Sequence, residues 1–225
     1  FRRVLFRSET QQNDREIVLE AVRQNGQALQ FASEEQKNDR DIVLAAVRQN
    51  AEVYTYLPEL LQHDIQIAVI AGLKNSDLIS NINPYVHSQI TAIRDNVMAL
   101  SNSRYELKNC REFVLEAVRQ NGMALRYASI NLKNDREVVM AAVRQDGMAL
   151  RYASIDLKRD REFMLDAVRQ NGLALAHALI ELQNDREVVM AAVRQNGMAL
   201  EHASQALRED RDVCRVAINT SSDAI

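Results

Sequence analysis

A stretch of 17 residues that occurs twice constrains the fold more than any other feature of this sequence. Residues 134–150 read NDREVVMAAVRQDGMAL and residues 184–200 read NDREVVMAAVRQNGMAL, so only Asp146 and Asn196 differ. Related segments recur every 25 residues except for one interval of 21, with starts at positions 13, 38, 63, 84, 109, 134, 159, 184 and 209. Such repeats are typical of solenoids, in which each unit buries its apolar face against its neighbours.

Each repeat is predicted to fold as a pair of helices. The tetrad Asn-Asp-Arg-Glu at residues 134–137 is typical of a capping box, in which Asn134 caps the helix and Glu137 reaches back to it. The apolar residues that follow have helical spacing and predict a buried face of Val138, Val139, Ala142 and Val143. A second helical segment is expected to bury Ala149, Leu150, Ala153 and Leu157. Neither helix exceeds about 12 residues, so both depend on stacking against neighbouring repeats.

The turn between the two helices carries Gly in most repeats, preceded by Asn. Gly147 and Gly172 are expected to adopt a positive φ, which ends a helix without the steric penalty of a side chain. We interpret the preceding Asn as a cap for carbonyl groups at the helix end. One position is Ala in all nine repeats, which indicates a close approach of helix backbones: Ala21, Ala46, Ala71, Ala92, Ala117, Ala142, Ala167, Ala192 and Ala217.

A second period of 50 residues is superimposed on the first. One position alternates between an acidic residue and alanine: Glu20, Ala45, Glu116, Ala141, Asp166 and Ala191. This alternation indicates either duplication of a pair of hairpins or two faces that are not equivalent. An Arg three residues further on recurs in seven repeats and is interpreted as part of a solvated face. The sequence therefore predicts an all-α solenoid of tandem 25-residue helical hairpins, paired into 50-residue units.

The chain is predicted to contain four segments. Residues 1–8, FRRVLFRS, can be back-translated into a sequencing-adapter sequence and are expected to be non-native, although a genuine helix end is the alternative. Residues 9–62 are N-terminal repeats, residues 63–108 are degenerate, shortened repeats with a kink, and residues 109–225 are regular C-terminal repeats, the ninth incomplete. We therefore expect the chain to be a fragment of a larger protein.

The composition excludes several classes of protein. A formal net charge of −3 over 225 residues gives no bulk positive field for nucleic acid or an anionic membrane. No apolar run approaches the length of a membrane span. Cys110 and Cys214 lie far apart without CxxC spacing, which indicates free thiols and a reducing compartment.

The repeat motif resembles a known family. NDREVVMAAVRQNGMALRYAS is similar to a tandem helical repeat of about 50 residues, catalogued as a domain of unknown function and found in bacterial effectors and in protist and algal proteins. The similarity covers residues 13–62 and 109–218 well and residues 63–108 poorly. It implies a non-catalytic helical array that accompanies other domains, located in the cytoplasm, or in the host-cell cytosol if the chain is an effector.

The sequence contains no pattern typical of an enzyme or a cofactor site. His177 and His202 occupy the same position in consecutive repeats, so about 8–10 Å should separate them. That distance is too long for two ligands of one metal ion, each bonded at roughly 2.0–2.1 Å. No glycine-rich phosphate loop is present. We expect no catalytic residue, no metal, no cofactor and no small-molecule substrate.

One position in the second helix varies in an informative way. It is aromatic or His, and an Arg precedes it in two repeats: Phe31, Tyr56, Arg126–Tyr127, Arg151–Tyr152, His177 and His202. We call these eight residues the aromatic stripe. They are interpreted either as packing between repeats or as a half-exposed surface for a protein partner, because aromatic residues, Met and Arg are enriched at protein interfaces.

The predicted function is a non-catalytic scaffold for protein–protein interaction. An alternative is an RNA-binding array, because an aromatic residue plus Arg in each repeat is typical of base-by-base recognition. The acidic net charge, and Ala176 and Glu201 at the Arg position, argue against nucleic acid. A structural spacer between domains is a third hypothesis.

The degenerate repeats are expected to open more readily than the regular ones. Pro58 and Pro84 flank this region, and the Arg-Gln-Asn-Gly turn is missing from it. In a linear array each repeat is stabilised only by its neighbours, so a shortened repeat weakens two interfaces. Native-state hydrogen exchange should therefore be faster at residues 63–108 than at residues 109–208. Equal protection in both regions would contradict this prediction.

Overall fold

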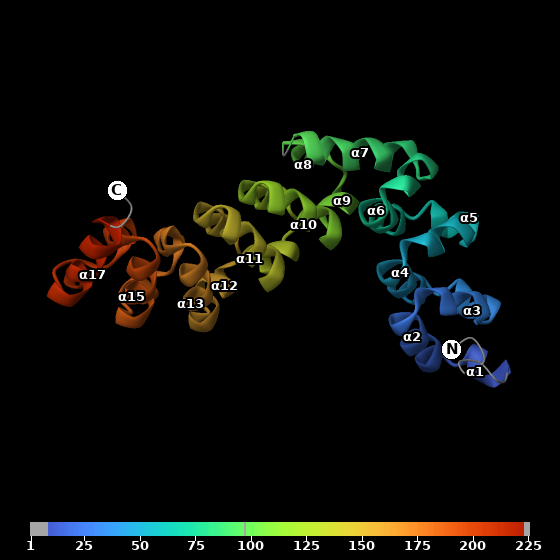
Figure 1. The fold of residues 1–225 in the computed structure, drawn as a ribbon, viewed down its shortest axis with the longest axis horizontal. Helices are drawn as coiled ribbons and strands as arrows, with labels where there is room; N and C mark the ends of the chain where they lie inside the picture. The colour runs from blue at the N-terminus through green and yellow to red at the C-terminus, as the bar shows by residue number, and fades with distance from the viewer. Residues whose placement is uncertain (1–8, 97, 223–225) are drawn as a thin grey trace. The chain divides into compact units, whose positions relative to one another are not determined.

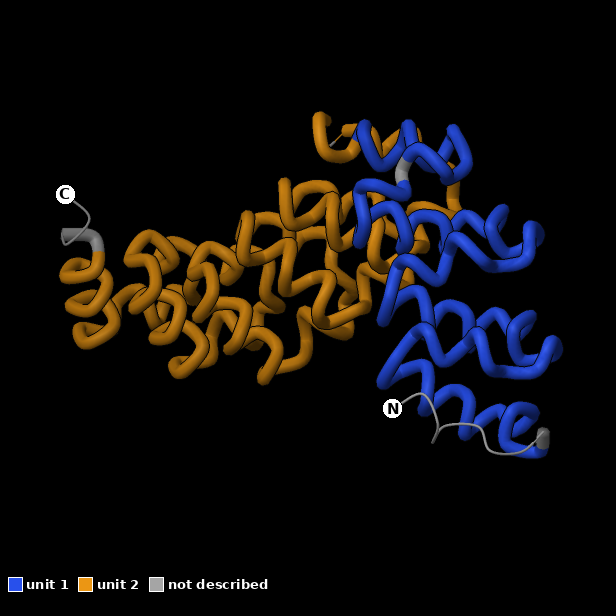
Figure 2. The backbone as a smooth tube through the Cα atoms, turned by 45° about the vertical axis from the view of Figure 1, so that its right-hand side comes forward, with its two compact units in different colours: residues 1–92 blue, residues 93–225 orange. Residues whose placement is uncertain are grey.

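The computed structural model describes residues 9–96 and 98–222, and in these residues it contains helices and no strand (Figure 1). The predicted all-α repeat fold is therefore confirmed. Residues 1–8, for which we predicted a non-native origin, lie outside the described residues. The chain divides into two compact units, residues 1–92 and 93–225 (Figure 2). The division falls inside the predicted degenerate segment.

The first unit contains three complete repeats and most of a fourth. Its helices are α1 (Glu9–Asn13), α2 (Arg15–Gln24), η1 (Gly26–Phe31), α3 (Glu34–Lys37), α4 (Arg40–Gln49), η2 (Ala51–Tyr56), α5 (Glu59–Gln62), α6 (Ile65–Lys74) and η3 (Ser76–Asn81), where η denotes a 3₁₀ helix. The boundary between the units lies within α7 (Pro84–Asp95).

The second unit continues the same pattern. Its helices are α8 (Ala99–Asn102), α9 (Tyr105–Lys108), α10 (Arg111–Gln120), η4 (Gly122–Tyr127), η5 (Leu132–Asn134), α11 (Arg136–Gln145), η6 (Gly147–Tyr152), α12 (Ile155–Arg159), α13 (Arg161–Gln170), η7 (Gly172–His177), α14 (Ile180–Gln183), α15 (Arg186–Gln195), η8 (Gly197–His202), α16 (Gln205–Arg208) and α17 (Arg211–Ser222).

A repeat consists of a ten-residue α-helix, a six-residue 3₁₀ helix and a short helical turn. The predicted second helix is thus a 3₁₀ helix and a separate turn, because the Ala-Ser pair between them is extended and Ser begins the next turn. Consecutive α-helices pack on each other, as α13 does on α15, and consecutive 3₁₀ helices do likewise. Each unit therefore has two layers, which we call the α layer and the η layer.

The buried faces are those that the spacing predicted. Val138, Val139 and Val143 of α11 are fully buried, and so are Ala149 and Leu150 of η6. The invariant alanines are also buried, except Ala92, which is half-buried. Because each ten-residue helix is too short to be stable alone, this burial between repeats is the main source of stability.

The cap of each α-helix is the Asp of the tetrad. Asp135 Oδ1 accepts hydrogen bonds from the backbone N–H groups of Glu137 and Val138, both at 3.0 Å. The expected cap, Asn134, was wrong by one position because Asn134 ends the preceding turn, η5. Its side-chain oxygen instead accepts a hydrogen bond from the hydroxyl of Ser154 in the next repeat, at 2.5 Å.

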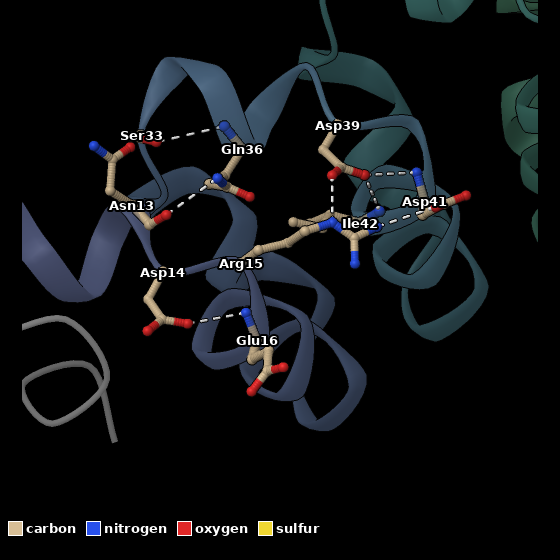
Figure 3. Close-up of polar contacts among 9 residues, drawn as sticks. All are labelled: Asn13, Asp14, Arg15, Glu16, Ser33, Gln36, Asp39, Asp41 and Ile42. Carbon is tan, nitrogen blue, oxygen red and sulfur yellow. Dashed lines mark hydrogen bonds and ion pairs between the residues drawn. The ribbon is translucent and has the colours of Figure 1, made fainter.

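The same Asp also receives an Arg from the preceding repeat (Figure 3). Arg15 Nε donates to Asp39 at 2.8 Å, and its terminal nitrogen donates to Asp41 at 3.1 Å. The pairing recurs along both units: Arg40 with Asp64, Arg111 with Asp135 and Glu137, Arg136 with Asp160, Arg161 with Asp185 and Glu187, and Arg186 with Asp210 and Asp212. The sequence analysis missed this row of inter-repeat ion pairs.

The row of arginines is interrupted in the degenerate repeats. Ile65 and Val86 occupy the Arg position there, and Cys110 replaces the Asp cap of α10 without forming a side-chain cap. Exposed ion pairs contribute about 0–1 kcal/mol each, so the row sets the register between repeats more than it stabilises them. Neither contact in the degenerate segment has this constraint.

The third repeat lacks the short turn found elsewhere. Here η3 keeps six residues, and only Ile82 and Asn83 separate it from α7. The four missing residues were predicted to shorten the second helix, but the part that is absent is the turn after it. As expected, Pro84 is the first residue of its helix, where a missing N–H is harmless.

Glycine is needed at the turn for space and not for a left-handed backbone. No described glycine has a positive φ, so the prediction for Gly147 and Gly172 was wrong. A Cβ atom on Gly172 would lie 2.5 Å from the carbonyl oxygen of Ala192 in the next repeat. The N–H of Gly172 also donates to the side chain of Gln195 in that repeat. The Gly and Ala positions therefore form one close contact between the two backbones.

The residue before the glycine ends one helix and begins the next. The N–H of Asn196 donates to the carbonyl of Ala192 at 2.8 Å, and its Oδ1 accepts from Met198 N–H at 3.0 Å. Asp146 does the same with Met148 at 2.9 Å, since only an acceptor oxygen is required. Our interpretation of this Asn as a carbonyl cap was wrong, because its side chain caps N–H groups.

Replacing Gly172 by Ala should destabilise the array. The added methyl would meet backbone atoms that cannot rotate away, so we expect a loss of roughly 1–3 kcal/mol in the free energy of unfolding, measured with urea. Ala51 occupies the same position in another repeat, and Ala51→Gly should change that free energy by less than about 1 kcal/mol. A Gly172→Ala variant as stable as the parent chain would contradict the close contact.

Candidate partner-binding surface

The aromatic stripe lies at the C-terminal ends of the 3₁₀ helices. In the first unit, Phe31 ends η1 and Tyr56 ends η2, and their exposed fractions are 47% and 40%. A cavity of about 400 Å³ lies beside Tyr56 and is lined also by Leu29, Leu57 and Pro58. Two aromatic side chains and an adjoining apolar cavity are therefore accessible on this side of the unit.

In the second unit the stripe has one member in each of four consecutive repeats. Tyr127, Tyr152, His177 and His202 end η4, η6, η7 and η8, and each is half-buried. Each of these 3₁₀ helices contacts the next, so the four residues form a continuous row. The Tyr127 hydroxyl lies 3.6 Å from the sulfur of Met98, one repeat earlier. The row thus contributes to packing between repeats and is also partly accessible.

The two arginines of the stripe stack on the tyrosines that follow them. The guanidinium carbon of Arg126 lies 5.6 Å from the centre of the Tyr127 ring, and that of Arg151 lies 5.3 Å from the Tyr152 ring. These distances allow cation–π attraction, which fixes the rings and keeps the arginines at the surface. The stripe therefore has ordered side chains in this part of the unit.

Positive charge near His177 disfavours protonation of its imidazole. Burial lowers the pKa of His177 below its ordinary value. Lys158 and Arg151 lower this pKa further by their charge, as does His202, while Asp146 acts in the opposite direction. The buried Nε2 atom of His177 has no hydrogen-bond partner among the described residues. His177 is therefore held neutral in the stripe.

A second row of exposed side chains was missed by the sequence analysis. Each member is the first residue of the short turn that follows a 3₁₀ helix: Tyr105, Ile130, Ile155 and Ile180. Their exposed fractions are 67%, 84%, 53% and 79%. We call them the aliphatic ridge. The signal was present in the sequence, because a large apolar residue recurs three positions after each stripe residue, outside the buried pattern.

The ridge is exposed because a short turn can bury only one side. Leu157, two residues after Ile155, is 5% exposed and anchors the turn, so Ile155 faces away from the core. Lys158 Nζ donates to the carbonyl of Arg151 at 2.7 Å and caps the preceding 3₁₀ helix. This geometry places the stripe and the ridge on the η layer of the second unit.

Other kinds of site have little support in the described part of the chain. No group of three or more His, Cys, Asp or Glu side chains there is placed to hold a metal ion. Cys110 is buried, and burial raises the pKa of its thiol to about 12. None of the described helices is both long enough and apolar enough to cross a membrane.

The repeats match a known family model. The model named Domain of unknown function (DUF4116) matches residues 14–62, 39–86, 90–133, 110–158, 160–208 and 185–225. The chain belongs to this family. Its length of about 49 residues per match agrees with a pair of repeats as the family's unit. No curated protein and no solved structure matches the chain.

The state of His177 predicts a dependence of stability on pH. Because the folded protein resists protonating this imidazole, the unfolded chain binds a proton more readily as the pH falls below about 6.5. The free energy of unfolding should therefore be independent of His177 above that pH and should decrease below it. We expect His177→Gln to reduce this decrease in urea titrations between about pH 7 and pH 5. His202→Gln, one repeat later, is the matched control, and an equal effect of both variants would contradict the assignment.

Proposed function

We propose that this chain is a non-catalytic scaffold that binds a protein partner along the η layer of its second unit. The observation that carries the proposal is the aliphatic ridge beside the aromatic stripe. Ile130 and Ile180 are each about four-fifths exposed, at 84% and 79%. Single exposed apolar residues are common, but a row that recurs in consecutive repeats is typical of an interaction surface.

The composition of the surface favours a protein as the partner. Tyr127 and Tyr152 provide rigid aromatic area, and Met148 and Met198, 38% and 67% exposed, are adaptable apolar contacts. Aromatic residues, Met and Arg are the types most enriched at protein interfaces. A partner that covers the ridge would remove aliphatic surface from water at about 25 cal/mol per Å².

An RNA-binding array is the second candidate, favoured by the stacked Arg126–Tyr127 and Arg151–Tyr152 pairs. Base stacking on aromatic residues with adjacent Arg is a common mode of single-strand binding. However, Ala176 and Glu201 replace the Arg in the next two repeats. The aliphatic ridge also has no role in contacts with phosphate. A protein partner therefore accounts for more of the surface.

Photo-crosslinking tests the proposal. Benzoylphenylalanine placed at Met148 should crosslink to a protein in an extract of the source organism. The same amino acid at Ile218, which is 64% exposed and outside the stripe and ridge, is the control. Ile155→Ser with Ile180→Ser should lower the yield at Met148 by at least about tenfold if the ridge contributes to affinity. Crosslinks that are destroyed by ribonuclease, or that form equally at Ile218, would contradict a protein partner on this surface.

A further inference from the structure

The α layer carries a cavity that the η-layer surface does not involve. It has a volume of about 600 Å³ and lies between α2 and α4. Three guanidinium groups line it, from Arg15, Arg23 and Arg48. Its floor is apolar and is formed by Leu19, Leu44 and Ala45. A cavity with cationic walls and an apolar floor fits an anionic group on an apolar stem.

The charges around this cavity do not cancel. The one carboxylate in its lining, Asp41, lies 3.1 Å from a terminal nitrogen of Arg15, which also binds Asp39. Arg23 has only a 4.0 Å contact with Glu20, and both side chains are about 60% exposed, at 62% and 63%. At that distance and exposure the pair contributes little. The remaining positive charge is therefore available to a ligand.

The 50-residue alternation keeps a carboxylate out of this cavity. Ala45 lines the cavity at the position where the preceding repeat has Glu20. A Glu at position 45 would place a negative charge among the arginines and fill part of the space. The second unit has the same alternation at Glu116 and Ala141, and again at Asp166 and Ala191.

Arginine recurs with this alternation in the second unit. Arg169 forms an ion pair with Asp166 at 3.5 Å, three residues earlier on the same helix. Arg144 and Arg194 follow Ala141 and Ala191 and form no ion pair within the described residues. Every second helix of the α layer therefore presents an uncompensated guanidinium beside a small residue. This explains the second period of the sequence, which packing alone leaves unexplained.

We propose that each 50-residue pair of repeats forms one groove in the α layer that binds an acidic side chain of a partner polypeptide. The arginines at the rim form charge-assisted hydrogen bonds to the carboxylate, and the apolar floor contacts its methylene stem. The planar guanidinium matches a carboxylate in a bidentate fashion. Successive repeats lie about 10 Å apart, the length of three residues of extended chain, so the array suits an extended acidic segment. The proposal does not depend on the η-layer surface.

The experiment uses the full chain and two synthetic peptides. One is an extended 12-residue peptide with Glu at every third position among Ala and Leu, and the other has Gln in place of each Glu. Titration is followed by calorimetry and by the NMR signals of arginine Nε–H groups. The Glu peptide should bind at least about tenfold more tightly than the Gln peptide and should shift the signals of Arg23, Arg144 and Arg194.

A matched pair of triple variants isolates the role of charge. Ala45→Glu, Ala141→Glu and Ala191→Glu together should weaken binding of the Glu peptide at least about tenfold. The corresponding Gln variant adds the same volume without charge and should bind within about threefold of the parent chain. Both variants should fold, because Glu occurs naturally at this position in Glu20 and Glu116, and circular dichroism checks this.

Three outcomes would overturn the proposal. They are equal affinity for the two peptides, unchanged binding by the triple Glu variant, and displacement of the Glu peptide by single-stranded RNA of equal charge. Crosslinking at Met148 in the η layer is unaffected by any of them, so failure of the groove is distinguishable from failure of the scaffold.

Discussion

The close contact between the Gly of one repeat and the Ala of the next determines how the rest of the array packs. At Gly172 a single methyl would lie 2.5 Å from the Ala192 carbonyl oxygen, so the two backbones approach as closely as side chains allow. This approach brings consecutive ten-residue helices together, and the valines beside the alanine become fully buried. Short helices that are unstable alone are thereby stabilised by their neighbours.

The polar residues of the repeat specify register around that contact. Asp185 caps its own helix and accepts Arg161 from the preceding repeat, and the Arg161 side chain lowers the pKa of Asp185 against the opposing effect of burial. One carboxylate thus has a role within its repeat and another between repeats. Where Ile65 and Val86 replace the arginine, the register is no longer specified in this way, and the division between the two units lies just beyond, at residue 92.

The two layers leave different surfaces for binding. The η layer presents the stripe and the ridge, in which aromatic and aliphatic groups are offered in consecutive repeats. The α layer presents arginines that a second period of the sequence leaves without a carboxylate. Because an array repeats its surface along its length, several weak contacts of one kind can act together on an extended partner. A scaffold of this kind needs no unique catalytic cluster.

The sequence by itself determined the repeat, the helical class and the buried faces, because helical spacing and invariant alanines report directly on local packing. It placed Tyr152 and His177 at one repeat position, but not their partial burial. Only the tertiary structure decided what depends on the next repeat. Gly172 lacks a positive φ because its neighbour requires the space, Asn134 binds Ser154 one repeat later, and Arg161 reaches Asp185 across the interface. Contacts about 20–25 residues apart have no local signature, since helical periodicity describes only a residue's own helix.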